Sequence, residues 1–102
     1  MSLKKQYLKT RERCKVTFRL PKAAAPGAKT VHIVGEFNDW STAKTAMKRL
    51  KSGEFTAVVE LVPGREYQFR YLIDQTVWEN DWEADRYVKS DFGDCDNSVV
   101  AV

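Results

Sequence analysis

The chain has 102 residues, of which 43% are hydrophobic, 12% aromatic and 30% charged, as expected for one globular domain with enough apolar side chains for a core. No apolar run approaches the roughly 18 residues that span a bilayer, and the opening MSLKKQYLKTRERCK lacks the apolar stretch of a signal peptide. We therefore expect a cytoplasmic protein without a membrane partner.

Charge is distributed unevenly along the chain. Residues 1–15 carry six basic side chains and one acidic one, whereas residues 71–102 carry eight acidic and two basic ones. A basic arm can bind nucleic acid or an acidic partner. However, the net charge is only +3, and Tyr7 alone offers an aromatic ring for base stacking in the basic run. We expect no nucleic-acid partner and interpret residues 1–12 as a solvated basic tail or short helical turn.

The two cysteines, Cys14 and Cys95, lie near opposite ends of the chain. A disulfide could tie the ends together, but free thiols are expected in a protein without an export signal. A single histidine and the lack of a paired-cysteine motif argue against zinc, and the spacing of Asp91, Asp94 and Asp96 does not fit a calcium loop. We predict no metal and no cofactor.

From residue 13 onward the chain alternates apolar and polar residues with the period of β-strands. The pattern is clearest in KVTFRL, EFTAVVELV and REYQFRYLID, and Pro-Gly pairs mark turns between such runs. The segment STAKTAMKRLKSG has some helical spacing, but among strands and turns we expect an irregular excursion that leads to a strand near residues 47–50. Short connections favour antiparallel pairing, so residues 13–102 are predicted to form one all-β antiparallel sandwich of about seven strands.

The run REYQFRYLID also predicts which side chains face outward. If its large apolar residues fill the core, Arg70 must project from the opposite face of the sheet. Arg70 could serve a ligand there, or it could pair with a carboxylate on a neighbouring strand such as Glu60. The large residues predicted to face the core are Tyr67, Phe69, Tyr71 and Ile73.

The stretch VHIVGEFNDW begins as a buried strand, breaks into a polar turn and ends on Trp40. An indole ring is costly to leave in water. Trp40 is therefore either a core anchor that follows a turn or a surface platform on which a flat ligand stacks.

Three segments read together carry a family resemblance. FNDW after an apolar strand, FRYLID followed by VW, and the terminal NSVVAV resemble the carbohydrate-binding modules of the isoamylase N-terminal type, family 48 of such modules, over residues 14–102. This family includes the glycogen-binding domain of the β subunit of AMP-activated protein kinase. The resemblance implies an immunoglobulin-like sandwich of the early-set group and a non-catalytic module that binds α-1,4-linked glucan or maltooligosaccharide.

The resemblance also implies a set of binding residues. In glycogen-binding members, two tryptophans form a sugar platform beside a basic residue and an asparagine, and these positions fall on Trp40, Trp78, Arg70 and Asn97. An indole suits the apolar face of a glucose ring, and the polar side chains suit its hydroxyl groups. Two departures bear on the site: arginine replaces the usual lysine at position 70, and the usual Asp-Gly turn becomes Asp74-Gln75 with one additional residue, which could displace Trp78.

Two other function classes remain to be weighed. Glycoside hydrolysis needs two carboxylates that flank a bound sugar, which a small sandwich with a shallow surface does not favour, and His32 on its strand is expected to be structural. Trp82 is interpreted as packing for the acidic loop. The rival hypothesis is a protein-interaction module that recruits or regulates another protein, such as a glycan-metabolising enzyme, through a sheet edge. Exposure of Trp40, Arg70 and Trp78 on one face would favour sugar binding.

Overall fold

The computed structural model describes residues 3–9, 12–90 and 95–102. These ranges contain two short 3-10 helices, Lys22–Ala24 and Glu36–Asn38, and nine strands. The strands are β1 (Leu3–Leu8), β2 (Arg13–Leu20), β3 (Val31–Gly35), β4 (Lys48–Arg49), β5 (Phe55–Leu61), β6 (Glu66–Ile73), β7 (Val77–Glu79), β8 (Arg86–Lys89) and β9 (Asp96–Ala101).

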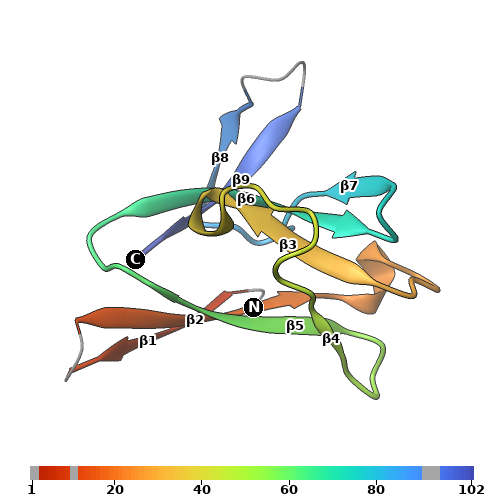
Figure 1. The fold of residues 1–102 in the computed structure, drawn as a ribbon, viewed down its shortest axis with the longest axis horizontal. Coiled ribbons are helices and arrows are strands. Elements are labelled where there is room, and N and C mark those ends of the chain that lie inside the picture. Colours follow the sequence, from red (N-terminus) through yellow and green to blue (C-terminus); the bar gives the residue numbers. More distant parts are fainter. Residues whose placement is uncertain (1–2, 10–11, 91–94) are drawn as a thin grey trace.

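The strands form two antiparallel sheets that pack face to face (Figure 1). The first sheet has the order β1-β2-β5-β4, and the second has the order β3-β6-β9-β8. Strand β7 pairs with the end of β6 that lies beyond β9. The predicted antiparallel sandwich is confirmed, with nine strands in the described ranges instead of about seven. The expected strand near residues 47–50 is the two-residue β4.

The N-terminal segment corrects the prediction of a solvated tail or helical turn. Residues Leu3–Leu8 form β1 and pair with β2 along its whole length. Leu3 is buried opposite Phe18, and the Lys5 ammonium reaches a carboxylate oxygen of Asp85 at 2.7 Å, beside the second sheet. The segment has too few apolar residues for a periodic signal, and its strand conformation comes from pairing with β2.

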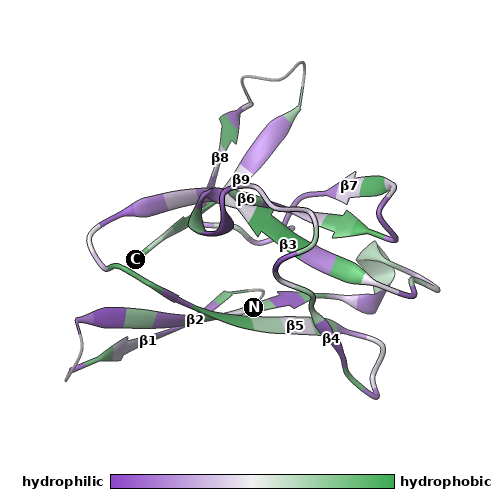
Figure 2. Ribbon diagram, viewed as in Figure 1, coloured by the Kyte–Doolittle hydropathy of each residue, from purple (hydrophilic) through white to green (hydrophobic). Residues whose placement is uncertain are grey.

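The core between the sheets is rich in aromatic rings. Phe18 on β2 and Phe69 on β6 are both buried, and they meet edge to face with ring centroids 5.0 Å apart, which joins the two sheets. Phe37, from the turn after β3, packs against both of these rings and closes this end of the core. Of the four residues predicted to face the core, Phe69, Tyr71 and Ile73 are buried and Tyr67 is half-buried. Figure 2 shows the alternation of hydrophilic and hydrophobic residues along the strands.

The loop after β7 is anchored by a buried carboxylate. Asp81 is 1% exposed, accepts a hydrogen bond from the Tyr71 hydroxyl at 2.6 Å and accepts another from the Glu83 amide at 2.8 Å. Burial and the neighbouring Asp81 raise the pKa of Tyr71 well above its usual value. Trp82, which was predicted to pack this loop, is 53% exposed. The residue that anchors the loop is therefore Asp81 and not Trp82.

Both cysteines are free thiols, as expected: Cys14 is buried and Cys95 is exposed. Within the described ranges, no helix is long and apolar enough to cross a membrane. Two of the acidic residues weighed as calcium ligands, Asp91 and Asp94, lie outside the residues that the structure describes.

Candidate functional site

A hollow of about 370 Å³ opens on the surface of the second sheet. All four residues predicted from the sequence line it, and its two tryptophans, Trp40 and Trp78, are 40% and 46% exposed. The described residues that line it are Glu36, Trp40, Gln68, Arg70, Trp78, Ser90 and Asn97. The two indoles are therefore surface groups beside one shared hollow.

The strand register explains how residues far apart in the sequence meet here. Side chains directly opposite each other on paired strands point to the same face of a sheet. Trp78 lies opposite Leu72, and Arg70 lies opposite Val34. Leu72 and Val34 are both buried, although they project away from the core between the sheets. Arg70 and Trp78 are thus directed to the outward face of the second sheet, where the hollow opens.

The turn that carries Trp40 is built by Gly35 and Asn38. A Cβ atom at Gly35 would lie 2.7 Å from the carbonyl oxygen of Gln68, so only glycine allows this close approach of β3 to β6. Asn38 is buried, accepts a hydrogen bond from the Gly35 amide at 3.0 Å and donates one to the Ile33 carbonyl at 2.9 Å. These contacts fix the path of the chain into Trp40.

The backbone at Trp40 is strained. Asp39 and Trp40 both have φ near 58°, in the left-handed region that costs a non-glycine residue about 1–2 kcal/mol. The Trp40 amide donates a hydrogen bond to the Gly35 carbonyl at 2.8 Å, which holds this conformation. Strain of this kind on an exposed tryptophan is typical of a functional position.

The turn between β6 and β7 sets the direction of Trp78. Asp74 and Gln75 are both left-handed, with φ of 50° and 59°, and Ile73 lies opposite Val77. Because side chains alternate along a strand, a shift of one residue would turn Trp78 toward the core. The register opposite Leu72 instead points Trp78 outward. The additional residue of this turn therefore does not remove Trp78 from the hollow.

Gln75 stands where the family resemblance implies a glycine, and its side chain connects two loops. Its amide nitrogen donates to the Thr42 carbonyl at 2.8 Å and lies 3.1 Å from Nδ1 of His32. An amide nitrogen can only donate, so this ring nitrogen of His32 is the acceptor. Gln75 thus fastens the segment after Trp40 to the hairpin that carries Trp78, and His32 has the structural role that was expected.

A chain of hydrogen bonds orders the polar side of the hollow. Nε of Arg70 donates to Oδ1 of Asn97 at 2.6 Å, and Nδ2 of Asn97 donates to the side-chain oxygen of Gln68 at 2.9 Å. Asn97 is only 6% exposed, and both the oxygen and the nitrogen of its side-chain amide are hydrogen-bonded to neighbouring side chains. The alternative pairing of Arg70 with Glu60 is wrong, because Glu60 lies on β5 in the first sheet.

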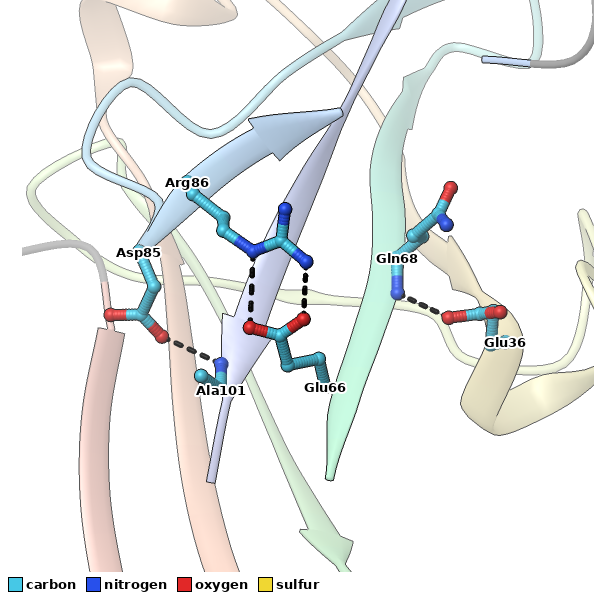
Figure 3. A network of polar contacts seen from close by, with 6 residues as sticks. All are labelled: Glu36, Glu66, Gln68, Asp85, Arg86 and Ala101. Atoms are coloured by element: carbon cyan, nitrogen blue, oxygen red, sulfur yellow. Dashed lines mark hydrogen bonds and ion pairs between the residues drawn. The ribbon is translucent and has the colours of Figure 1, made fainter. Parts of the chain in front are cut away.

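Glu36, Gln68 and Ser90 were not identified from the sequence. The Glu36 carboxylate accepts a hydrogen bond from the Gln68 backbone amide at 2.6 Å, just beyond the last ladder pair of β3 and β6 (Figure 3). Gln68 could have been found, because it alternates with Arg70 on the outward face of β6. Glu36 and Ser90 follow strand ends, where periodicity gives no signal.

An ion pair between Arg86 and Glu66 lies on the same sheet as the hollow. Arg86 on β8 donates two hydrogen bonds to the carboxylate of Glu66 on β6, and Asp85 accepts one from the Ala101 amide at 2.7 Å (Figure 3). The hydrogen bond from Arg86 lowers the pKa of Glu66. The Asp85 contact holds the loop between β7 and β8 to the end of β9, and the Arg86–Glu66 pair connects β8 with β6.

The hollow can bind a neutral, hydroxyl-rich ligand with flat apolar faces. Two indoles offer stacking surfaces, while Arg70 supplies donors and the Glu36 carboxylate supplies acceptors. Glu36 is the one carboxylate among the described residues that line the hollow. These described residues therefore do not provide the two flanking carboxylates that glycoside hydrolysis uses.

Comparison with known families decides the identity of the domain. A model of the glycogen recognition site of AMP-activated protein kinase matches residues 14–102. The chain belongs to this glycogen-recognition family. The match covers the nearly complete sandwich and agrees with the resemblance found in the three sequence motifs.

The chain is also similar to part of a solved enzyme structure. The crystal structure of apo pullulanase from Paenibacillus barengoltzii superposes with a TM-score of 0.53 and is 25% identical in sequence. The similar region covers 98% of this chain but 14% of the pullulanase chain, so the protein corresponds to a small part of that enzyme. Among curated proteins, none matches this chain.

Proposed function

We propose that this member of the glycogen-recognition family is a non-catalytic module that binds α-1,4-linked glucan. Membership in the family supports a carbohydrate ligand. The single observation that carries the proposal for this chain is that Trp40, Trp78, Arg70 and Asn97 line one hollow with both indoles exposed.

Each group in the hollow has a separate role in this proposal. Trp40 and Trp78 stack on glucose rings and bury apolar C–H surface. Arg70 donates from its terminal guanidinium nitrogens to sugar hydroxyls, and Glu36 accepts from them. Asn97 positions Arg70 and contributes little surface of its own, since it is almost wholly buried.

The module's partners and location are part of the same proposal. A glycan-metabolising enzyme fits as a partner, because the similar region of the pullulanase is a small part of a larger chain. Free thiols at Cys14 and Cys95 fit a reducing compartment such as the cytoplasm. The rival hypothesis of an interaction module without sugar binding is disfavoured by the exposure of both tryptophans in the hollow.

Retention on glycogen tests the proposal, with Trp40→Ala compared with Trp82→Ala. Trp82 is an exposed tryptophan outside the lining of the hollow, which makes it a matched control. We expect the wild-type chain and Trp82→Ala to be retained and eluted by maltoheptaose, and Trp40→Ala to pass through. Equal retention of all three proteins, or of none, would contradict the proposal. Circular dichroism of each variant checks that the sandwich is intact.

A further inference from the structure

The outward face of the first sheet is strongly basic. On β2, outward and buried residues alternate, so Arg13, Lys15 and Arg19 point away from the core. On the strands beside β2 and β5, Lys4 lies opposite Thr17 and Lys48 lies opposite Thr56, which places both lysines on the same face. The described outward residues of this sheet include five exposed basic side chains: Lys4, Arg13, Lys15, Arg19 and Lys48.

The positive charge of this face is offset only in part, by the single acidic residue Glu60 among its described residues. Glu60 lies opposite Lys15 and is the one acidic side chain among the described outward residues of the four strands. The ion pairs of Lys5 with Asp85 and of Arg86 with Glu66 lie outside this face. Two basic residues of the segment that was interpreted as a solvated tail are thus held on strand β1: Lys4 on this face, and Lys5 in its ion pair with Asp85.

The centre of this face is less polar than its surroundings. Val58 is 50% exposed on β5 and lies opposite Thr17 on β2. Thr17 and Thr56 are half-buried beside it. An apolar centre with charged residues around it is the usual anatomy of a protein–protein interface.

We propose that this basic face, formed by Lys4, Arg13, Lys15, Arg19 and Lys48 around Val58, binds an acidic polypeptide segment. Complementary charge would steer such a partner and fix its orientation, and Val58 would contribute apolar contact. The face belongs to the first sheet, whereas the hollow opens on the second, so the two surfaces lie on opposite sides of the sandwich (Figure 1). The domain can therefore hold an acidic protein and a ligand in the hollow at the same time.

Nucleic acid and an anionic membrane fit this face less well. Single-stranded nucleic acid requires aromatic rings for base stacking, and the described outward residues of this sheet include none. A duplex is read by elements that protrude into a groove, whereas this face is a sheet surface. A membrane would attract the lysines, but Val58 alone offers little apolar area for insertion.

Fluorescence anisotropy with a fluorescein-labelled oligoglutamate peptide tests the proposal in the absence of sugar. The face variant Lys15→Glu with Arg19→Glu is compared with Lys51→Glu with Lys89→Glu, which changes the net charge equally at exposed positions elsewhere. We expect the face variant to bind about tenfold more weakly or worse, and the control to stay within about twofold of wild type. Raising the salt concentration should weaken the wild-type complex, because the charges are exposed.

Further arms separate the proposal from its alternatives. The variant Lys4→Glu with Lys48→Glu, on the edge strands, replaces the first face variant if that one does not fold. Stronger binding of duplex DNA or of phosphatidylserine vesicles than of the peptide, equal losses in the face and control variants, or no peptide binding at low salt would overturn the proposal. The outcome does not depend on glucan binding, and Trp40→Ala should bind the peptide as wild type does.

Discussion

Arg70 and Asn97 are joined by a hydrogen bond of 2.6 Å from Nε to Oδ1. This bond uses only one of the nitrogen atoms of the guanidinium group. The guanidinium group has further N–H donors at its terminal nitrogens, for which the described residues show no hydrogen-bond partner, and Arg70 lines the hollow. A lysine, which the family resemblance implies at this position, has a single nitrogen to bond both Asn97 and a ligand. The arginine at position 70 is therefore suited to being held by the protein while it contacts a ligand.

Substitution Arg70→Lys should weaken maltoheptaose binding about fivefold, corresponding to the loss of a hydrogen bond of about 1 kcal/mol. Isothermal titration calorimetry measures this directly. If Asn97 acts through Arg70, the losses in Arg70→Lys and Asn97→Ala should not add in the double variant. Fully additive losses would show that Asn97 contacts the sugar independently.

Substitution Gln75→Gly should reduce glucan affinity without reducing stability. Glycine adopts the left-handed conformation of this turn without strain, so the unfolding midpoint should be unchanged or higher. The contacts of Gln75 with Thr42 and His32 are lost, which frees the segment after Trp40 from the hairpin of Trp78. Calorimetric titration and thermal unfolding together test this. Wild-type affinity in Gln75→Gly would mean that the connection does not position the tryptophans.

The left-handed backbone at Trp40 predicts a difference between two variants that both lack the indole. Trp40→Ala keeps the strain at φ 58°, whereas Trp40→Gly relieves about 1 kcal/mol of it. Neither variant should bind glucan, but urea unfolding should show the glycine variant to be as stable as the alanine variant or more so. A glycine variant that is clearly less stable would indicate an unstrained turn.

The carboxylate of Asp74 makes stability depend on pH. It accepts hydrogen bonds from the amides of Thr30 and Lys29, at 2.9 and 2.8 Å, and these bonds lower its pKa in the folded state. A lowered pKa stabilises the fold above the unfolded value of about 3.9, and this contribution is lost as the pH falls through the folded pKa. Glu66, whose pKa Arg86 lowers, adds to the same trend.

Urea unfolding of wild type and Asp74→Asn across this range tests the prediction. Asparagine can still accept both hydrogen bonds and tolerates the left-handed backbone, so the variant should fold. The wild-type advantage should be greatest near neutral pH and shrink as the pH falls from the unfolded-state pKa of about 3.9 through the lowered pKa of folded Asp74. A constant difference from neutral to acidic pH would contradict a role for the ionised carboxylate.

Much of the fold follows from local sequence patterns. Alternation in β2 and β6 correctly separated the core residues from outward ones such as Arg70, and the motif resemblance named four of the residues that line the hollow. Strand β1 was missed because Lys4, Lys5 and Gln6 give no apolar period, and its conformation depends on pairing with a distant strand.

Other parts of the site depend on contacts that no local pattern contains. Glu36 enters the hollow because its carboxylate accepts from Gln68, a residue on another strand. The outward direction of Trp78 follows from the register of β6 and β7. The sequence did not predict this register, because the turn at Gln75 departs from the pattern that the resemblance implies. Trp82 was predicted to pack the acidic loop because tryptophan is usually buried. In the structure, the buried carboxylate of Asp81 holds this loop by accepting a hydrogen bond from Tyr71.

The most direct test of glucan binding in the hollow uses the three tryptophans as separate reporters. In nuclear magnetic resonance spectra of the ¹⁵N-labelled chain, each indole N–H gives its own signal, which single substitutions can assign. During titration with maltoheptaose, the signals of Trp40 and Trp78 should shift and saturate together, while that of Trp82, outside the lining of the hollow, should stay in place. Unmoved signals of Trp40 and Trp78 at saturating sugar would contradict the central claim.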